Sequence, residues 1–283
     1  MKNNEINIRD PFVLVEGDTY YMYGTRAANF GYNTGGFDVY ISKDLTNWSE
    51  PHACFDSEAH GLNRKVNWAP EVHKYRGAYY MFATFTKENG LRGTFSLKAD
   101  SPLGPFLPHS EGALTPYEWE CLDGTLYIDR DGKPYLVFCH EHTQIIDGTI
   151  CYVALSEDLK RAAGEVTTLF CASSPAWADD LPKDVHRVTD GPFMYRSKTG
   201  ELFMLWSTFI KEQYAECLVK FPTGELCEEF VHLDPLITDD GGHGMIFSGA
   251  NGLFLTYHTP NTKNYEHPFF RPLTDHGDHL TLT

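Results

Sequence analysis

The sequence predicts an all-β fold, a five-bladed β-propeller that residues 1–283 form as one domain. The first observation is a hairpin pattern that recurs five times: a small or acidic start, a short apolar strand, a Gly-containing turn and an aromatic-rich strand. The second is that helical periodicity is scarce, whereas 24 Gly and 16 Pro are scattered throughout. The five copies are DPFVLVEGDTYYMYGT from Asp10, APEVHKYRGAYYMFATF from Ala69, DGTLYIDRDGKPYLVFCH from Asp123, DGPFMYRSKTGELFMLWST from Asp190 and GHGMIFSGANGLFLTYHT from Gly242.

A third strand with a polar tail follows most of these hairpins, as in GFDVYISKDLTNWSEP, RGTFSLKADSPLGPF and TICYVALSEDLKRAAGE. The element Ser-x-Asp-Leu occurs in this tail at 42–45 and again at 156–159. The strands are nearly continuous apolar runs, as expected for sheets that are covered on both faces. A β-sandwich also contains many strands, but it does not explain five copies of one unit. The repeat therefore favours propeller blades.

In a propeller the first strand of each blade lines the central axis, so the residues that open these strands meet in one pocket. We expect the five copies to bring together Asp10, Glu71, Asp123, Asp190 and His243. An Asp next to Pro or Gly commonly forms a turn and does nothing more. Its recurrence at blade starts is what predicts a shared acidic site.

The composition restricts the class of partner. Hydrophobic residues make up 42% of the chain and aromatic residues 14%, which predicts a folded globular protein. Asp and Glu outnumber Lys and Arg by 39 to 23, and the net charge of −16 repels nucleic acid and anionic membranes while it suits neutral or cationic partners. The apolar runs are far shorter than the roughly 20 residues of a membrane helix. Seven cysteines without a Cys-x-x-Cys pair, and no leader-like segment before the first motif, predict reduced thiols in a cytoplasmic protein.

The motifs that open the blades resemble those of glycoside hydrolase family 43: RDP, WAPEV, an Asp, an acid-Gly-Pro and GHG, in this order over residues 9 to about 272. The resemblance implies an inverting, five-bladed enzyme that removes or cuts arabinofuranose, xylose or related sugars in plant polysaccharides. It also implies that Asp10 is the general base and that Asp123 orients and tunes the general acid. The family's acid is the Glu of a Glu-Gly-Pro. This chain has Asp-Gly-Pro, so the expected acid is Asp190, whose side chain is one methylene shorter.

Two other carboxyls compete with Asp190 for the role of acid. Glu141 follows a strand in FCHEHTQ, and Glu120 in YEWECLDGT resembles the Glu-Cys of invertase-type propellers, in which that Glu is the acid. Either could instead bind sugar hydroxyls. Inversion needs a base and an acid roughly 6.5–9.5 Å apart, which opposite sides of a funnel supply. HEHTQ does not predict zinc, because alternation along a strand separates Glu141 from its flanking histidines.

A sugar presents an apolar ring face and a rim of hydroxyls, so its site combines aromatic platforms with polar side chains. The candidate platforms are Trp68, just before the second blade, and Phe37 or Phe30 in the first long loop. The polar candidates are Glu71, Glu120, His140 and Arg271. For His243 the resemblance implies a cation at the axis, commonly calcium, held mostly through waters. Calcium prefers oxygen ligands, so one His is weak support for it.

These observations predict a glycosidase in the arabinofuranosidase or xylosidase range. Short connections between blades and no appended β-sandwich indicate a compact pocket and exo action. Two alternatives stay open: a non-catalytic carbohydrate-binding propeller, favoured by the Glu-to-Asp change at position 190, and a related propeller that acts by retention or phosphorolysis. Retention would need carboxyls only about 5–5.5 Å apart, and the few Arg and Lys near the blade starts disfavour phosphorolysis. The sequence leaves the sugar, its linkage and the oligomeric state open.

Overall fold

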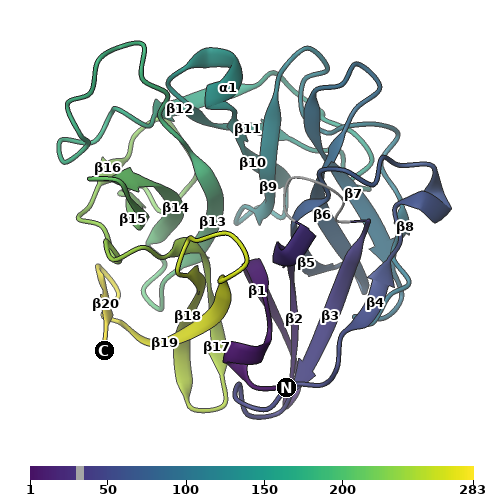
Figure 1. The fold of residues 1–283 in the computed structure, drawn as a ribbon. Coiled ribbons are helices and arrows are strands. Elements are labelled where there is room, and N and C mark those ends of the chain that lie inside the picture. Colours follow the sequence, from purple (N-terminus) through teal and green to yellow (C-terminus); the bar gives the residue numbers. More distant parts are fainter. Residues whose placement is uncertain (30–34) are drawn as a thin grey trace.

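The computed structural model describes residues 1–29 and 35–283, and it has the five-bladed β-propeller fold that the sequence predicts (Figure 1). In this part of the chain, five four-stranded antiparallel sheets surround a central axis, and each sheet takes its strands from one continuous stretch of sequence. Within the same two ranges, no helix has the length and apolar character needed to span a membrane.

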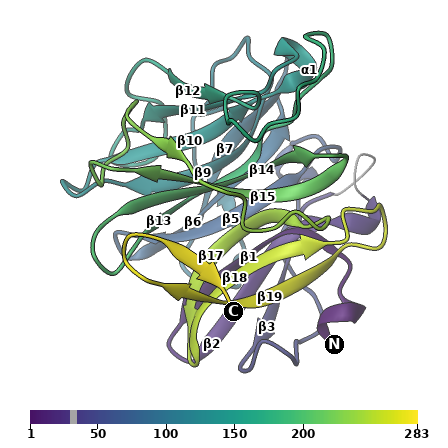
Figure 2. The ribbon, with the colours of Figure 1, turned by 90° about the vertical axis from the view of Figure 1, so that its left-hand side faces the viewer.

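Each blade is a meander whose first strand lies at the axis and whose fourth strand lies at the outer edge (Figures 1 and 2). The first strands are β1 (Ile8–Glu16), β5 (Trp68–Tyr75), β9 (Cys121–Ile128), β13 (Asp190–Arg196) and β17 (Gly242–Gly249). The second strands are β2 (Thr19–Arg26), β6 (Ala78–Thr86), β10 (Pro134–His140), β14 (Leu202–Ile210) and β18 (Gly252–Thr259). The third strands are β3 (Phe37–Ser42), β7 (Arg92–Ala99), β11 (Thr149–Ala154), β15 (Gln213–Phe221) and β19 (His267–Asp275). The fourth strands are β4 (His52–Phe55), β8 (Leu107–Pro108), β12 (Thr167–Cys171), β16 (Val231–His232) and β20 (Leu280–Leu282).

Helices are short and lie in the connections between strands. The described helices are η1 (Asn3–Glu5), η2 (Ala27–Asn29), η3 (Glu58–His60) and α1 (His142–Ile145). In a view from the side, α1 and the connection from β18 to β19 lie at the same end of the propeller, on the right of Figure 2.

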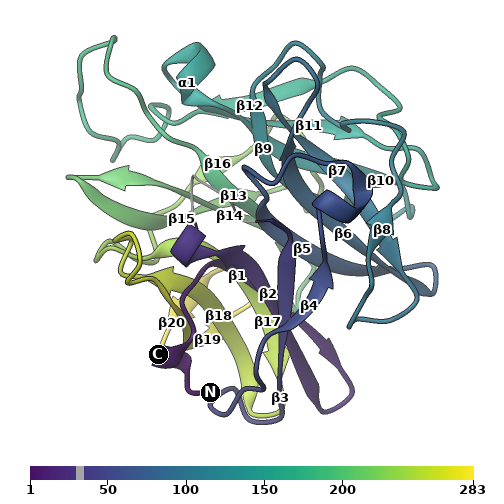
Figure 3. The same ribbon diagram turned by 45° about the vertical axis from the view of Figure 1, so that its right-hand side comes forward.

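The ring closes where the first blade meets the last. The amide of Ile8 donates to the carbonyl of Glu266 at 3.2 Å, and Nδ1 of His267 lies 2.8 Å from the carbonyl oxygen of Ile6. Arg9 adds an ion pair with the carboxylate of Glu266 at 3.1 Å. The N-terminus lies beside the first blade and the C-terminus beside the last (Figures 1 and 3).

Apolar side chains fill the space between neighbouring sheets. Phe82, Phe138 and Trp206 come from second strands of three different blades, and all are fully buried. Trp206 packs edge-on against Phe170 of β12, with ring centroids 5.1 Å apart. Because these strands are covered on both faces, they need apolar residues at almost every position, which explains the continuous runs in the sequence.

Each inner strand contains a β-bulge near its start, where its pairing with the second strand shifts register. One residue of each bulge has a left-handed backbone conformation. These residues are Asp10 (φ 54°), Ala69 (46°), Asp123 (55°), Gly191 (49°) and His243 (55°). Four of them are not glycine, and this conformation costs such residues about 1–2 kcal/mol. The bulges also show that the five sequence copies are out of register with one another. Asp190 precedes its bulge residue by one position, and Glu71 follows its own by two.

A second ring of side chains holds the bulges. In each blade the residue paired with the position before the bulge is, in order, Thr25, Thr84, Cys139, Ser207 and His258. Four of them accept the amide proton of the next blade's bulge residue: Thr25 from Ala69 at 2.7 Å, Thr84 from Asp123 at 3.0 Å, Ser207 from His243 at 2.7 Å and His258 from Asp10 at 3.2 Å. In the remaining case, the amide of Gly191 donates to Oδ2 of Asp123 at 3.2 Å. Each blade therefore fixes the start of its neighbour.

Candidate active site

The bulges border a pocket of about 470 Å³ at one end of the axis, and its walls come from all five blades. Among its lining residues are six that the sequence predicts for the site: Asp10, Trp68, Asp123, Glu141, Asp190 and His243. The fold thus brings together acids that lie as far apart in the chain as positions 10 and 190. Their individual roles stay predictions.

Asp10 is held by contacts on both carboxylate oxygens. The hydroxyl of Thr25 donates to Oδ2 at 2.7 Å, and Nδ1 of His243 lies 3.1 Å from Oδ1. Burial raises the pKa of Asp10, but the positive charges of His243 and Arg9 and the Thr25 hydrogen bond outweigh burial and lower it below its usual value. Asp10 is therefore a carboxylate at neutral pH, the state that a general base requires.

His243 supplies the positive charge at the axis. Its Nδ1 lies between two carboxylates, 3.1 Å from Asp10 and 3.8 Å from Asp123. Burial lowers the pKa of His243, but Asp10, Asp123 and Asp190 raise it, with a net value of about 9. An imidazolium at neutral pH therefore balances part of the negative charge of the pocket.

Asp123 and Asp190 form the acidic side of the pocket. Burial raises the pKa of Asp123 well above its usual value, and the negative charge of Asp190 raises it further, although His243 lowers it. Burial also raises the pKa of Asp190 to about 6, and the charge of Glu141 contributes. The phenol of Tyr214 donates to Oδ2 of Asp190 at 2.9 Å. Two neighbouring carboxyls that disfavour joint ionisation keep a proton near neutral pH, as a general acid must.

Glu141 and Glu120, the competing candidates for the acid, share one arginine. Nη2 of Arg92 donates to Oε2 of Glu141 at 2.5 Å, and Nε of Arg92 donates to Glu120. Nε2 of His142 lies 3.1 Å from the other oxygen of Glu141. The guanidinium also lies over the ring of Trp68, 5.1 Å from its centroid. Both glutamates are thus engaged in ion pairs at the pocket wall, an arrangement that suits binding and positioning.

Two of the predicted sugar contacts belong to the interior. Phe37 is fully buried, and its ring centroid lies 6.0 Å from that of Phe55 and 5.9 Å from that of Phe85. Phe37 is the first residue of β3, so it lies in a strand of the blade and not in the predicted loop. The carboxylate of Glu71 is buried beyond the bulge and lies 3.0 Å from Nε2 of His73. Neither side chain lines the pocket, so the structure corrects both predictions.

Three further candidates do not line the pocket. Glu120 is bound by Arg92, and of these two residues Arg92 is the one that lines the pocket. The ring of His140 stacks on Trp119 at 4.2 Å, and Arg271 lies in β19, the third strand of its blade. The alternative platform Phe30 falls outside the described residues. Of the predicted aromatic platforms, Trp68 is the one among the described residues that lines the pocket.

Sequence reasoning missed Arg92, Tyr214 and His258. Arg92 begins β7 and Tyr214 lies near the start of β15. The third strand of a meander runs parallel to the first, so its first residues reach the same end of the propeller. That rule could have found both residues. His258 occupies in blade 5 the position that Thr or Ser occupies in three other blades. Burial, with the charge of Arg9, lowers its pKa to about 3, so it is neutral and accepts the amide of Asp10.

A buried glutamate, Glu216, holds the backbone next to His243. Oε2 of Glu216 accepts hydrogen bonds from the amide of Gly244 at 2.8 Å and from the hydroxyl of Ser207 at 3.1 Å. Burial raises the pKa of Glu216 to about 8, although these contacts and His243 lower it. The carboxyl is therefore mostly protonated at neutral pH. It binds the backbone directly after His243, and it also binds the Ser207 hydroxyl that accepts the His243 amide.

The residues at the axis do not form a ready metal site. Among residues 1–29 and 35–283, no group of three or more His, Cys, Asp or Glu is placed to hold a metal ion. Nδ1 of His243 instead faces the carboxylates of Asp10 and Asp123. The described residues therefore offer no direct ligand set for the expected calcium, which the resemblance implies is held mostly through waters.

A propeller whose axial pocket combines an ionised carboxylate, a carboxyl that keeps its proton and an aromatic wall is suited to cleave glycosidic bonds. The model of the family described as glycosyl hydrolases family 43 matches residues 5–224. The chain belongs to this family, as the blade motifs indicate.

Three curated relatives match about half of the chain. The extracellular exo-α-(1→5)-L-arabinofuranosidase ArbA of Cellvibrio japonicus is 24% identical over 149 residues, which are 47% of this chain and 41% of the relative. The extracellular endo-α-(1→5)-L-arabinanase 1 of Bacillus subtilis is 23% identical over 146 residues, 48% and 44% of the two chains. The xylosidase/arabinosidase 43A of Humicola insolens is 28% identical over 142 residues, 46% and 42%. The matched segments span less than half the length of these relatives.

Solved structures resemble the whole chain. The crystal structure of an endo-arabinase from Bacteroides thetaiotaomicron is 38% identical, covers 99% of both chains and superposes with a TM-score of 0.88. An α-L-arabinofuranosidase from Lactobacillus brevis is 18% identical, with 98% of this chain and 93% of that chain covered and a TM-score of 0.77, and it supports the fold alone.

Proposed function

We propose that this protein is a glycosidase that hydrolyses α-L-arabinofuranosyl linkages of arabinan-type chains with inversion. The observation that carries the proposal is the opposite protonation of two carboxyls in one pocket. The pKa of Asp10 is lowered, whereas that of Asp190 is raised to about 6. One group can therefore accept a proton while the other donates one. The choice of arabinose rests on the family and on the 38% identical relative, whose name is endo-arabinase.

The proposed step uses water as the nucleophile. Asp10 accepts a proton from a water molecule while the water oxygen forms a bond to the anomeric carbon. The bond from that carbon to the leaving oxygen breaks, and Asp190 donates its proton to this oxygen. His243 keeps Asp10 ionised before the step through its contact at 3.1 Å. Asp123 positions the acid, because its Oδ2 accepts the amide of Gly191, the residue after Asp190.

The structure changes the argument for exo action. Short connections between blades were expected, but residues 172–189 form a long connection from β12 to β13, at the pocket end of the propeller. Exo action stays the prediction from the compact axial pocket, and the endo-arabinase relative favours endo action as the second candidate. Product analysis on linear arabinan separates the two. Exo cleavage releases arabinose as the first product, whereas endo cleavage releases a mixture of oligosaccharides.

The test of the catalytic assignment is Asp10→Asn, assayed on aryl arabinofuranoside, xyloside and galactofuranoside. General base catalysis contributes about 10²–10⁴-fold, so we expect a loss of about 10³-fold in kcat with little change in sugar binding. The matched control is Asp100→Asn, an exposed residue in a bend, which should leave kcat unchanged. Full activity of Asp10→Asn would remove the proposed base. Preference of the wild type for a xyloside would remove the proposed sugar.

A further inference from the structure

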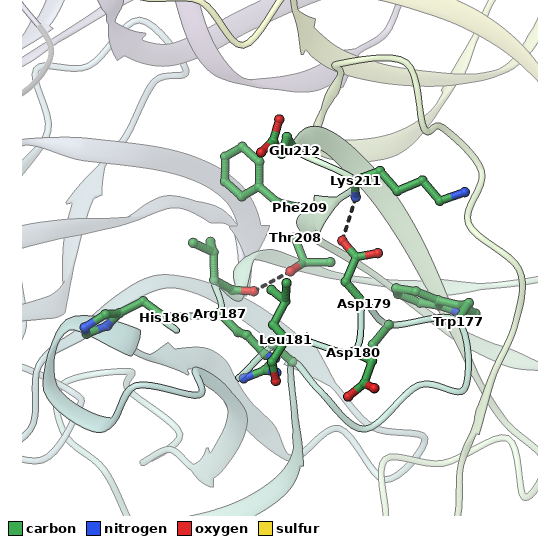
Figure 4. Close-up of a pocket in the computed structure, with 13 residues that line it drawn as sticks. Trp177, Asp179, Asp180, Leu181, His186, Arg187, Thr208, Phe209, Lys211 and Glu212 are labelled. Atoms are coloured by element: carbon green, nitrogen blue, oxygen red, sulfur yellow. Dashed lines mark hydrogen bonds between the residues drawn. The ribbon is translucent and has the colours of Figure 1, made fainter. Parts of the chain in front are cut away.

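A groove of about 800 Å³ lies beside the axial pocket (Figure 4). One wall is the connection 172–189 and the other is the end of β14 with its turn into β15. Val188 and Phe209 line both the groove and the axial pocket. The two hollows are therefore neighbours that share a rim.

The groove lies on the side of the proposed acid. Asp190 follows the rim residue Val188 by two positions, and it pairs with Ser207, two positions before the rim residue Phe209. The ring of Phe209 lies 5.2 Å from that of Tyr214, whose phenol donates to Asp190. Asp10, in contrast, is held by blades 1 and 5. An inverting acid protonates the leaving oxygen, so the part of the substrate beyond this oxygen leaves past Asp190.

The walls of the groove have the chemistry of a sugar site. Phe209 is 43% exposed and Leu181 39% exposed, which leaves two apolar side chains open to solvent at its surface. Asp179 and His186 add polar groups, and in Figure 4 the carboxylate of Asp179 points toward Lys211 on the opposite wall. An apolar surface next to hydroxyl-binding groups is what a sugar ring needs.

The wall is also fixed before any ligand binds. Nε1 of Trp177 donates to the carbonyl of Leu233 at 2.9 Å, and the Trp177 ring stacks on the buried Trp206 with centroids 5.9 Å apart. The carboxylate of Asp179 accepts the amide of Lys211 at 2.6 Å, which ties the two walls together. A preformed site of this kind binds with a small cost in ordering.

We propose that this groove binds the leaving-group sugars of a neutral linear arabinan, and that it makes cleavage depend on chain length. The inference rests on the proposed function for the identity of the sugar. The net charge of −16 favours a neutral chain over an acidic one. Binding energy from sugars far from the reacting bond then lowers the barrier for long substrates, and an aryl glycoside does not gain it.

The test is Leu181→Trp, which fills the groove from an exposed position outside the axial pocket. The matched control is Leu107→Trp, because Leu107 is 52% exposed and lies in β8, outside the lining of both hollows. Both variants and the wild type are assayed for kcat/KM on an aryl α-L-arabinofuranoside and on linear α-1,5-arabino-oligosaccharides of two to six sugars. We expect Leu181→Trp to lower kcat/KM on the longest oligosaccharide by about tenfold and to leave the aryl glycoside within about twofold. Leu107→Trp should match the wild type on both.

Two results would overturn the groove proposal. One is a wild-type kcat/KM that does not rise with chain length. The other is a Leu181→Trp variant that matches Leu107→Trp on the oligosaccharides. If the Trp variant fails to fold, Leu181→Ala replaces it, and its melting temperature shows that it is folded. It should also lower kcat/KM on the oligosaccharides.

A binding measurement separates this proposal from the proposed function. Calorimetry in the Asp10→Asn background, with the same oligosaccharides, should show tighter binding with each added sugar and a loss of that trend with Leu181→Trp. A wild-type protein that cleaves no arabinoside would refute the proposed function. The binding trend would still test whether the groove binds sugars. Equal binding with and without Leu181→Trp would refute the groove alone.

Discussion

The protonation of Asp190 gives the sharpest prediction, because its pKa is raised to about 6, within the pH range of an activity assay. The perturbation is Tyr214→Phe, which removes the phenol that donates to Oδ2 of Asp190 at 2.9 Å and keeps the buried ring. This hydrogen bond favours the carboxylate, so its removal should raise the pKa of Asp190 further above its wild-type value of about 6.

The magnitude follows from the two protonation states. With a pKa of about 6, Asp190 is about nine-tenths protonated at pH 5 and about one-tenth protonated at pH 7. The kcat/KM of the wild type on a substrate with a poor leaving group should therefore fall about tenfold between pH 5 and pH 7. A net hydrogen-bond free energy of about 1 kcal/mol corresponds to about 0.7 of a pH unit. The fall in the variant should thus be centred near pH 6.7.

The assay is the pH profile of kcat/KM on alkyl and aryl arabinofuranosides. The sign is fixed, because an acid acts when protonated and activity is lost as pH rises through its pKa. Asp190→Asn should remove the fall and cost far more on the alkyl than on the aryl substrate. The control is Tyr265→Phe, a 66% exposed residue, which should leave the profile unchanged. A fall that stays near pH 6 in Tyr214→Phe, or that persists in Asp190→Asn, would refute the assignment of the acid.

The remaining predictions concern the pocket wall, the core and the metal. Arg92→Met leaves two glutamates without their partner, so the free energy of unfolding should drop by about 3 kcal/mol. The control is Arg76→Met, which breaks the exposed pair of Arg76 and Glu157. If denaturant unfolding shows an equal, small change in the free energy of unfolding for both Arg→Met variants, the role of Arg92 is contradicted. Phe37→Ala should cost about 3–5 kcal/mol of stability with KM unchanged, and a raised KM in a stable variant would restore Phe37 as a sugar platform. Calcium, expected from the resemblance, is tested by chelator titration. Because His243 faces carboxylates, activity and melting temperature should stay constant, and a loss of either that calcium restores would contradict this.

The sequence predicts the blades well because each carries its own local signal. A Gly-containing turn between two apolar strands is a short-range feature, and five copies of it leave few folds to choose from. Asp10 and Asp123 could be predicted as axial residues for the same reason, since each opens a copy. What the sequence cannot show is the exact position of each bulge. A shift of one residue moves Asp190 ahead of its bulge residue, and only the backbone conformation reveals it.

Contacts between blades were beyond sequence reasoning for a different reason. Arg92 meets Glu120 and Glu141 across 28 and 49 residues of chain, and no local pattern marks such a pair. The boundary of β3 decides that Phe37 is a core residue, although its neighbours in sequence read as a loop. The sequence analysis predicts short connections between blades, whereas residues 172–189 form a long one. Their packing against the β14–β15 turn, which forms the groove, is a tertiary feature that no local pattern marks.

The anomeric configuration of the first product tests the central claim most directly. If Asp10 and Asp190 act from opposite sides of the bond, water attacks the face opposite the leaving oxygen. Proton NMR during the first turnovers on an aryl α-L-arabinofuranoside should then show β-arabinofuranose before mutarotation. Initial release of the α-anomer would mean a covalent intermediate, and it would contradict an Asp10-activated water as the nucleophile.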